Sequence, residues 1–446
     1  MVRNVLFLTE APSNKAMFLN TLPPLGTLSI AAYIRSKGIN VSVIDGNIDE
    51  VNEELLYKQD AVAMSINISN VVNSKQRAKN IKEHNPNAKI IAGGVYPREH
   101  ADDFLSDNFD VVVSGEGEIT LHEYLTTNDP LTVLGLYILK DGKTHFTGVR
   151  PKIKDLDSLP FPALDLVDIK KYHYPLKKKT PFSTIITSRD CPHECIFCYH
   201  ERGWRARSEK NVVDEIEWQV NTLGVKEIAI IDDFFNLNME RVEKICDLII
   251  ERKIKVALQC WGGLRVDRVS KQMLEKLKKA GTWLIGMAPE SGNPETLVKV
   301  KKRFTKEQVI NVRRWCKELG LVSYAFFMVG FPWEDKKQIE NTLDFARELD
   351  AEITQFSRVY PIQGTELYDM VNKEQGYTES KEDVGFFYGG ARVQVEGLTG
   401  EEVEKLIQKG YRKIYLRPKK MFDLLRALTI PDIYTLTKYA FTTNSI

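Results

Sequence analysis

Three cysteines lie within eight consecutive residues, and their spacing constrains this chain more than any other feature. Cys191, Cys195 and Cys198 form a C-x3-C-x2-C run with no fourth cysteine nearby. One loop can thus offer three thiolates, which suits three corners of a cubane [4Fe-4S] cluster. The fourth iron is then left without a protein ligand, so a small molecule can bind it, as at a catalytic zinc site that keeps one position open.

Two simpler interpretations of these cysteines stay open. The thiols could bind zinc together with His193 or His200, or they could be ordinary core side chains. Structural zinc sites usually show two separated C-x2-C pairs, and the chain has no second pair. Three incidental core thiols are not expected so close together, so the spacing favours a cluster. The isolated Cys246, Cys260 and Cys316 are expected to be core thiols, which argues against a second cluster.

Length and composition set the frame. The chain has 446 residues, 43% of them apolar and 28% charged, which is typical of a globular protein with two or three domains. Its net charge of +1 provides no overall electrostatic field that would attract nucleic acid. No apolar stretch approaches the ~20 residues that span a bilayer. The basic run at 299–303 is expected to be a solvated face. We expect a cytoplasmic protein without a transmembrane segment, since an oxygen-labile cluster fits a reducing compartment.

The first 125 residues alternate short β-rich runs with helical periods, which predicts a Rossmann-like parallel sheet. Ligands of such sheets bind beyond the carboxyl ends of the strands. Loops containing glycine fall at those ends, and glycine allows a backbone to approach a bulky ligand closely. The predicted strands are 5–8, 41–44, 61–66, 89–92 and 110–113, and the predicted helices are 27–36, 72–84 and a third ending near 125.

Residues 126–180 are expected to form a linker, with a hairpin at Asp141-Gly142. A partial (β/α)6 TIM-like barrel is predicted for 181–365, with functional residues at the carboxyl ends of its strands. A small, mostly helical region is predicted for 366–446 and should contribute a substrate pocket. Its amphipathic helix starts after Thr399, with Glu402 placed for a capping box. The apolar segment 422–439 could be core or a lid.

The expected elements of the barrel follow a regular order. The predicted strands are 183–187, 227–231, 255–260, 283–287, 323–329 and 352–358, and the predicted helices are 209–223, 239–252, 271–280, 305–319 and 336–349. Charged and hydroxyl groups follow these strands directly. Carboxylates suit an amine or ribose hydroxyls as ligands, and an arginine suits a carboxylate. The residues at these strand ends are Asp232, Asp233, Arg265, Glu290 and Ser291.

The cysteine run resembles the signature of the radical S-adenosylmethionine superfamily, and the whole order of segments resembles its cobalamin-binding subclass. The resemblance implies a [4Fe-4S] cluster on Cys191, Cys195 and Cys198, S-adenosylmethionine at the open iron, and cobalamin in domain 1–125. It further implies that Phe197 packs near the adenine and that Tyr199 lies beside the cluster. The implied catalytic residues are Tyr199 and Arg265; the implied cofactor-binding residues are Phe197, Asp232, Asp233, Glu290, Ser291, Pro24, Leu25, Gly26, Ser65, Gly93, Gly94, Gly115 and Glu116.

Two departures from the related proteins are informative. A glycine is more usual than Asp190 before the first cysteine, which puts the local backbone geometry in doubt. No Asp-x-His-x-x-Gly motif occurs, so the resemblance implies a cobalt without a histidine on its lower face. A sheet that no longer binds corrin stays open as an alternative.

The resemblance implies a cobalamin-dependent radical methyltransferase. Such an enzyme methylates an unactivated carbon by means of a 5′-deoxyadenosyl radical and methylcobalamin. A small-molecule, lipid-like or peptide substrate and an external electron donor such as a flavodoxin or ferredoxin would be its partners, and no nucleic acid. Two alternatives remain: a cyclase or rearrangement enzyme that transfers no methyl group, and a non-catalytic protein that only binds cluster and corrin.

Overall fold

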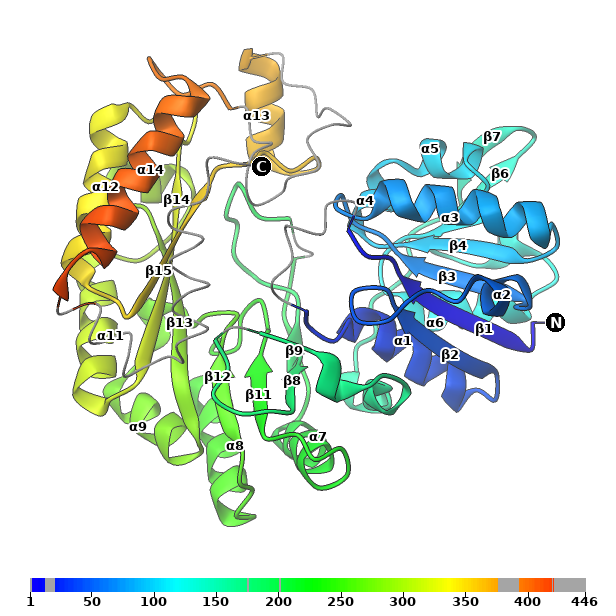
Figure 1. The fold of residues 1–446 in the computed structure, drawn as a ribbon, viewed down its shortest axis with the longest axis horizontal. Coiled ribbons are helices and arrows are strands. Elements are labelled where there is room, and N and C mark those ends of the chain that lie inside the picture. Colours follow the sequence, from blue (N-terminus) through cyan, green and yellow to red (C-terminus); the bar gives the residue numbers. More distant parts are fainter. Residues whose placement is uncertain are drawn as a thin grey trace. The chain divides into compact units, whose positions relative to one another are not determined.

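The computed structural model describes residues 2–12, 21–174, 176–199, 202–375, 393–418 and 420. The chain divides into two compact units, Met1–Tyr174 and Pro175–Ile446, which Figure 1 shows in the colours of the sequence. The predicted apolar segment 422–439 lies outside the described residues. Among the helices that are described, none combines the length and the apolar character needed to cross a bilayer.

The first unit is built on a seven-stranded sheet in the order β2-β1-β3-β4-β5-β6-β7. Its first five strands are parallel, as predicted. These strands are β1 (Asn4–Thr9), β2 (Asn40–Asp45), β3 (Ala61–Ser65), β4 (Lys89–Gly93) and β5 (Val111–Val113), and the helices are α1 (Leu25–Ser36), α2 (Glu53–Tyr57), α3 (Val71–His84), α4 (Val95–Glu99), α5 (Ala101–Ser106) and α6 (Gly117–Thr126).

The last two strands of this sheet form a hairpin, β6 (Leu136–Lys140) and β7 (Lys143–Phe146), and β6 runs antiparallel to β5. The turn residues Asp141 and Gly142 have φ values of 53° and 73°. Both lie in the left-handed region that a two-residue hairpin turn requires. The hairpin was expected within a linker, but it extends the sheet of the first unit.

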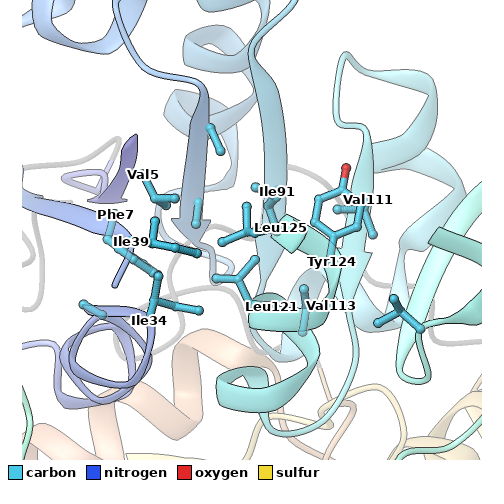
Figure 2. Packing of buried hydrophobic residues seen from close by; sticks show 14 of the residues in the cluster. Val5, Phe7, Ile34, Ile39, Ile91, Val111, Val113, Leu121, Tyr124 and Leu125 are labelled. Carbon is cyan, nitrogen blue, oxygen red and sulfur yellow. The ribbon is translucent and has the colours of Figure 1, made fainter. Parts of the chain in front are cut away.

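Packing between the strands and helices α1 and α6 forms one of the cores of this unit. Figure 2 shows Val5 and Phe7 of β1, Ile34 of α1, and Leu121 and Leu125 of α6 among the residues that fill it. Each of these five side chains is at most 3% exposed. Burial of such side chains contributes about 1.5–3 kcal/mol each, so this core fixes the helices that begin at the carboxyl ends of the strands.

The second unit contains a six-stranded parallel sheet in the order β15-β14-β13-β12-β11-β8, which matches the predicted partial barrel. A helix precedes each new strand and returns the chain to the start of the sheet. The strands are β8 (Phe182–Ile185), β11 (Glu227–Ile230), β12 (Ala257–Cys260), β13 (Thr282–Glu290), β14 (Val322–Val329) and β15 (Ile353–Arg358); the helices are α7 (Glu209–Asn221), α8 (Met239–Glu251), α9 (Lys271–Lys279), α10 (Pro294–Lys299), α11 (Lys306–Leu319), α12 (Lys336–Leu349), α13 (Glu366–Gln375) and α14 (Gly400–Tyr415).

Helix α14 covers the open edge of this sheet. It begins with the predicted capping box of Thr399 and Glu402 and lies beside α12 (Figure 1). The Tyr415 hydroxyl accepts a hydrogen bond from the Thr354 backbone N–H at 2.8 Å and donates to the carbonyl of the same residue at 2.9 Å. Tyr411, one turn earlier, accepts a hydrogen bond from the N–H of Phe356. An edge strand with unpaired backbone groups can pair with other chains. The two tyrosine hydroxyls occupy backbone groups of β15 and so disfavour such pairing.

Replacement of Tyr415 by phenylalanine should weaken the edge of the second unit. The change leaves a buried N–H and a buried C=O of Thr354 without their partner, which costs about 1–3 kcal/mol. We expect faster amide hydrogen exchange in peptides that cover β15, measured by mass spectrometry. Tyr137→Phe, which removes a hydroxyl with no described hydrogen bond, is the control and should leave β15 unchanged. Equal exchange in both variants would contradict the role of Tyr415.

Candidate active site

The three cysteines lie on a loop whose two ends are joined by a short antiparallel ribbon. Strand β9 (Ser188–Arg189) leads into the loop, and β10 (Arg205–Ala206) leads out, with Arg205 opposite Arg189. Cys191 forms an isolated bridge with Arg202, whose guanidinium donates to the carbonyl of His193 at 2.6 Å. The loop therefore starts and ends at the carboxyl end of β8, where the barrel pattern predicts functional groups.

The three thiols lie near one another but do not converge on one point. Cys195 is buried, Cys191 is half-buried and Cys198 is exposed. Desolvation raises the pKa of Cys191, and the neighbouring Cys195 and Asp233 raise it further. Although Cys198 is exposed as a residue, desolvation by the protein around its thiol raises the pKa to about 12, with Cys195 and Asp233 again adding to the shift. The raised pKa values favour the protonated thiols of Cys191 and Cys198 until a cation displaces the proton.

This donor set fits a cubane cluster better than a single metal ion. Among the described residues, no group of three or more Cys, His, Asp or Glu side chains is arranged to hold one ion. The zinc interpretation with His193 therefore finds no support in this part of the chain, and His200 lies outside it. A cubane binds each cysteine through a different iron, so three separated thiols on one loop are the arrangement it needs.

The segment ahead of the loop is fixed by the buried Asp232, which is 2% exposed. Its carboxylate accepts hydrogen bonds from the Thr187 backbone N–H, the Thr187 hydroxyl and the Ser188 hydroxyl, each at 2.6 Å. Arg241, 5% exposed, donates to the Thr187 carbonyl at 2.8 Å. Burial raises the pKa of Asp232, and these donors act against that shift. These contacts hold the start of the loop, and the predicted contact of Asp232 with a cofactor stays a prediction.

The backbone at Asp190 accounts for the departure seen in the sequence. Its φ is 70°, in the left-handed region where glycine is favoured. The aspartate is held there by Arg205, whose Nε and Nη2 both lie 2.8 Å from the same carboxylate oxygen. The doubt about local geometry is thus resolved, because an ion pair stabilises the conformation that glycine would adopt without strain.

A second ion pair lies beside the cysteine loop. The Glu290 carboxylate ends β13 and lies 2.9 Å from the ammonium of Lys302, and both side chains are mostly buried. Burial alone would lower the pKa of Lys302, but Glu290 and Cys195 outweigh it and raise the pKa. The ammonium also lies 5.9 Å from the ring of Phe197. A solvated face was expected for the run that contains Lys302, and this expectation is wrong for Lys302.

The remaining predicted residues of this unit occupy different environments. Arg265 is held by Asp267 at 2.9 Å and lies over the rings of Phe234 and Phe304. Phe197 is half-buried against Phe331, and Asp233 is exposed. Tyr199 is half-buried next to Cys198. Phe197 and Arg265 lie near Lys302, and Asp233 lies near the thiols. Contact of these residues and of Tyr199 with a cofactor stays a prediction.

Ser291 belongs to a buried polar network. Its hydroxyl lies 3.2 Å from that of Thr342 and accepts the N–H of Asn293 at 3.1 Å. The buried Glu334, which the sequence analysis did not single out, accepts the N–H groups of Gly330 and Phe331. This network fixes the loops that follow β13 and β14, so Ser291 positions neighbouring backbone. Neither Lys302 nor Glu334 carries a local motif, which explains why both were missed.

In the first unit, the predicted cobalamin-binding residues form an open rim at the carboxyl ends of the strands. Gly26, Ser65, Gly94 and Gly115 are exposed. A Cβ at Gly26 or Gly115 would have no atom within 4 Å, so these positions leave free space. A Cβ at Gly94 would lie 2.4 Å from the Ile66 carbonyl oxygen, so only glycine fits there. A rim with three exposed glycines is a surface on which a large flat ligand such as a corrin can lie.

The other predicted rim residues are less open. Pro24 precedes α1, and Leu25 is buried at its first turn. Gly93 ends β4 and is half-buried. The carboxylate of Glu116 accepts the backbone N–H of Ile153 at 2.8 Å. These four residues are thus less exposed than the glycines of the rim, and their contact with cobalamin stays a prediction.

Comparison with protein families agrees with this arrangement. A model described as the radical SAM superfamily matches residues 185–346, which include the cysteine loop, Asp232, Glu290 and Lys302. A model described as the B12 binding domain matches residues 14–125, which include the glycine-containing rim. The two matches follow each other in the order that the sequence predicts.

Similar proteins extend the match over most of the chain. An uncharacterised methyltransferase of Pyrococcus horikoshii is 28% identical over 424 residues, covering 90% of this chain and 89% of the relative. An anaerobic magnesium-protoporphyrin IX monomethyl ester cyclase of Rubrivivax gelatinosus is 26% identical over 380 residues. The alignment covers 80% of this chain and 67% of the relative.

Among solved structures, the cobalamin-dependent S-adenosylmethionine radical enzyme OxsB, with aqua-cobalamin and S-adenosylmethionine bound, has the same fold. It aligns with a TM-score of 0.78 at 18% identity, over 95% of this chain and 70% of that one. The two family models, in the expected order, lead to a single assignment. The chain belongs to the cobalamin-dependent radical S-adenosylmethionine enzymes, which use a [4Fe-4S] cluster, S-adenosylmethionine and cobalamin.

Proposed function

We propose that this enzyme is a methyltransferase that methylates an unactivated carbon of its substrate. The observation that carries the proposal is the cysteine loop with the buried Glu290–Lys302 pair beside it, on a chain that also carries a cobalamin-type unit. A relative named as a methyltransferase is similar over both units. An sp³ carbon offers no nucleophile, so a polar methyl transfer fails and a radical route is required.

The cofactors supply the difficult chemistry when bound: a 5′-deoxyadenosyl radical from S-adenosylmethionine at the cluster, and a methyl group on cobalamin. The chain supplies ligands and positions. Cys191, Cys195 and Cys198 each bind one iron. The ammonium of Lys302 and the carboxylate of Glu290 match the carboxylate and the amine of the methionyl group, since opposite charges form the strongest hydrogen bonds.

The other assignments follow from the same proposal. Phe197 offers an apolar ring beside Lys302 for the cofactor, and the rim around Gly26, Gly94 and Gly115 offers a face for cobalamin. Residues 1–125 are proposed as the cobalamin domain, and 181–365 as the radical domain. A small-molecule, lipid-like or peptide substrate and a reduced flavodoxin or ferredoxin complete the reaction, in the reducing cytoplasm.

A second candidate function is a radical cyclisation without methyl transfer. It is favoured by the cyclase of Rubrivivax gelatinosus, which is similar over 80% of this chain. Cluster, S-adenosylmethionine site and cobalamin rim would serve both reactions, so these residues do not separate the two. What separates them is the fate of the methyl group of S-adenosylmethionine.

Replacement of Cys195 by alanine should abolish cluster binding. The variant retains two thiols, which leaves two irons of the cubane without a protein ligand. We expect anaerobically reconstituted Cys195→Ala protein to hold almost no iron or sulfide by chemical analysis. Cys246→Ala, which removes a buried thiol on α8, should hold as much as the wild type. A Cys195→Ala protein with full iron and sulfide would contradict the assignment.

Replacement of Lys302 by methionine should weaken the binding of S-adenosylmethionine. A charged hydrogen bond contributes about 1.5–3 kcal/mol, so we expect the Kd to rise roughly 10- to 100-fold, measured by calorimetry on cluster-loaded protein. Lys301→Met is the matched control, because Lys301 forms only a partly exposed pair with Glu366. Equal affinities in the two variants would exclude Lys302 from the site.

The proposed reaction is tested with S-adenosylmethionine labelled in its methyl group. Reconstituted protein with cobalamin and a reductant should transfer the label to cobalamin and should also release 5′-deoxyadenosine, both followed by mass spectrometry. A cyclase would release 5′-deoxyadenosine and leave cobalamin unlabelled. A protein that only binds the cofactors would give neither product.

A further inference from the structure

Asp190, directly before the first cysteine of the loop, has an unfavourable backbone conformation. Its φ of 70° is one that few non-glycine residues adopt. Such a conformation costs of order 1–3 kcal/mol and persists only where the surroundings enforce it. The position of Cys191 depends directly on this residue, because the two are adjacent.

The carboxylate of Asp190 is enclosed by the two ends of the cysteine loop. Arg205 contacts one carboxylate oxygen through both Nε and Nη2, at 2.8 Å each. The side chains of Asp190 and Arg205 are only 9% and 15% exposed, so water screens the pair weakly. Arg205 lies on β10, and Asp190 directly follows β9, so the ion pair joins the entry and the exit of the loop.

We propose that the Asp190–Arg205 pair is a positioning element for the cluster. The pair holds Asp190 in the left-handed conformation and thereby sets the direction in which Cys191 presents its thiol. This inference rests on the assignment of the cluster to the three cysteines.

The pair also sets the local charge. Asp190 neutralises Arg205, a cation on the ribbon that bears the loop. Without the carboxylate, the entry of the loop carries one negative charge fewer, which would favour the reduced cluster, because the reduced cluster carries one more negative charge. The reduction potential of iron–sulfur clusters depends on nearby charge, so loss of Asp190 should raise it.

Three substitutions separate the two roles. Asp190→Ala removes the pair and keeps the strain, so its cluster should lose iron to a chelator roughly tenfold faster than the wild type. Asp190→Gly removes both the ion pair and the backbone strain. Asp190→Asn removes the charge but introduces a residue that tolerates the left-handed region. Both should keep iron close to the wild-type level and shift the midpoint potential, measured by electron paramagnetic resonance titration, to more positive values.

Glu194→Gln is the matched control. It removes one carboxylate from the same loop, but that side chain is 52% exposed and its ion pairs are screened by water. We expect normal iron retention and a smaller shift of the midpoint potential than in Asp190→Gly. Equal potentials in Asp190→Gly, Asp190→Asn and wild type, together with normal iron retention in Asp190→Ala, would overturn the inference. A wild-type protein that binds no cluster would instead refute the cluster assignment, and this inference with it.

Discussion

The buried carboxylate of Asp232 fixes the point from which the cysteine loop departs. A buried charge is tolerated only when hydrogen bonds replace its water, and Asp232 receives three, all from Thr187 and Ser188. Arg241 holds the carbonyl of Thr187 from the other side. Loss of one of these donors would leave the buried carboxylate with fewer hydrogen bonds, which costs about 1–3 kcal/mol. The loop thus starts from a rigid base, although its own residues are partly exposed.

The elements of the fold were predictable because their signals are local. Buried parallel strands appear as short apolar runs, and amphipathic helices repeat their apolar residues with a helical period. The hairpin turn at Asp141-Gly142 was equally clear from two residues. The sequence did not show that this hairpin joins the sheet, because the pairing of β6 with β5 brings together strands that a helix separates. Helix α10 was missed because six residues are too few to show a period.

Only compact motifs made parts of the proposed site recognisable in the sequence. The cysteines are such a motif, and the glycine-bearing rim is another. The sequence cannot tell which of Asp232 and Asp233 is buried, because this depends on the direction in which the chain leaves β11. Lys302 looked like part of a solvated run, since its partner Glu290 lies in the preceding strand with α10 between them. Pairs of this kind become visible only when the fold brings them together.

Backbone strain links the cysteine loop to the ion pairs around it. In the described part of the chain, five of the seven non-glycine residues with positive φ follow a helix or occupy the hairpin turn, where such values are ordinary. The other two, Asp190 and Glu290, stand at the ends of strands beside the loop. Each has its carboxylate held by a mostly buried cation, Arg205 or Lys302. A strained residue at a functional site persists when its surroundings over-determine it. The same combination occurs twice around one loop, which indicates that charge, rather than glycine, sets the backbone beside the three cysteines.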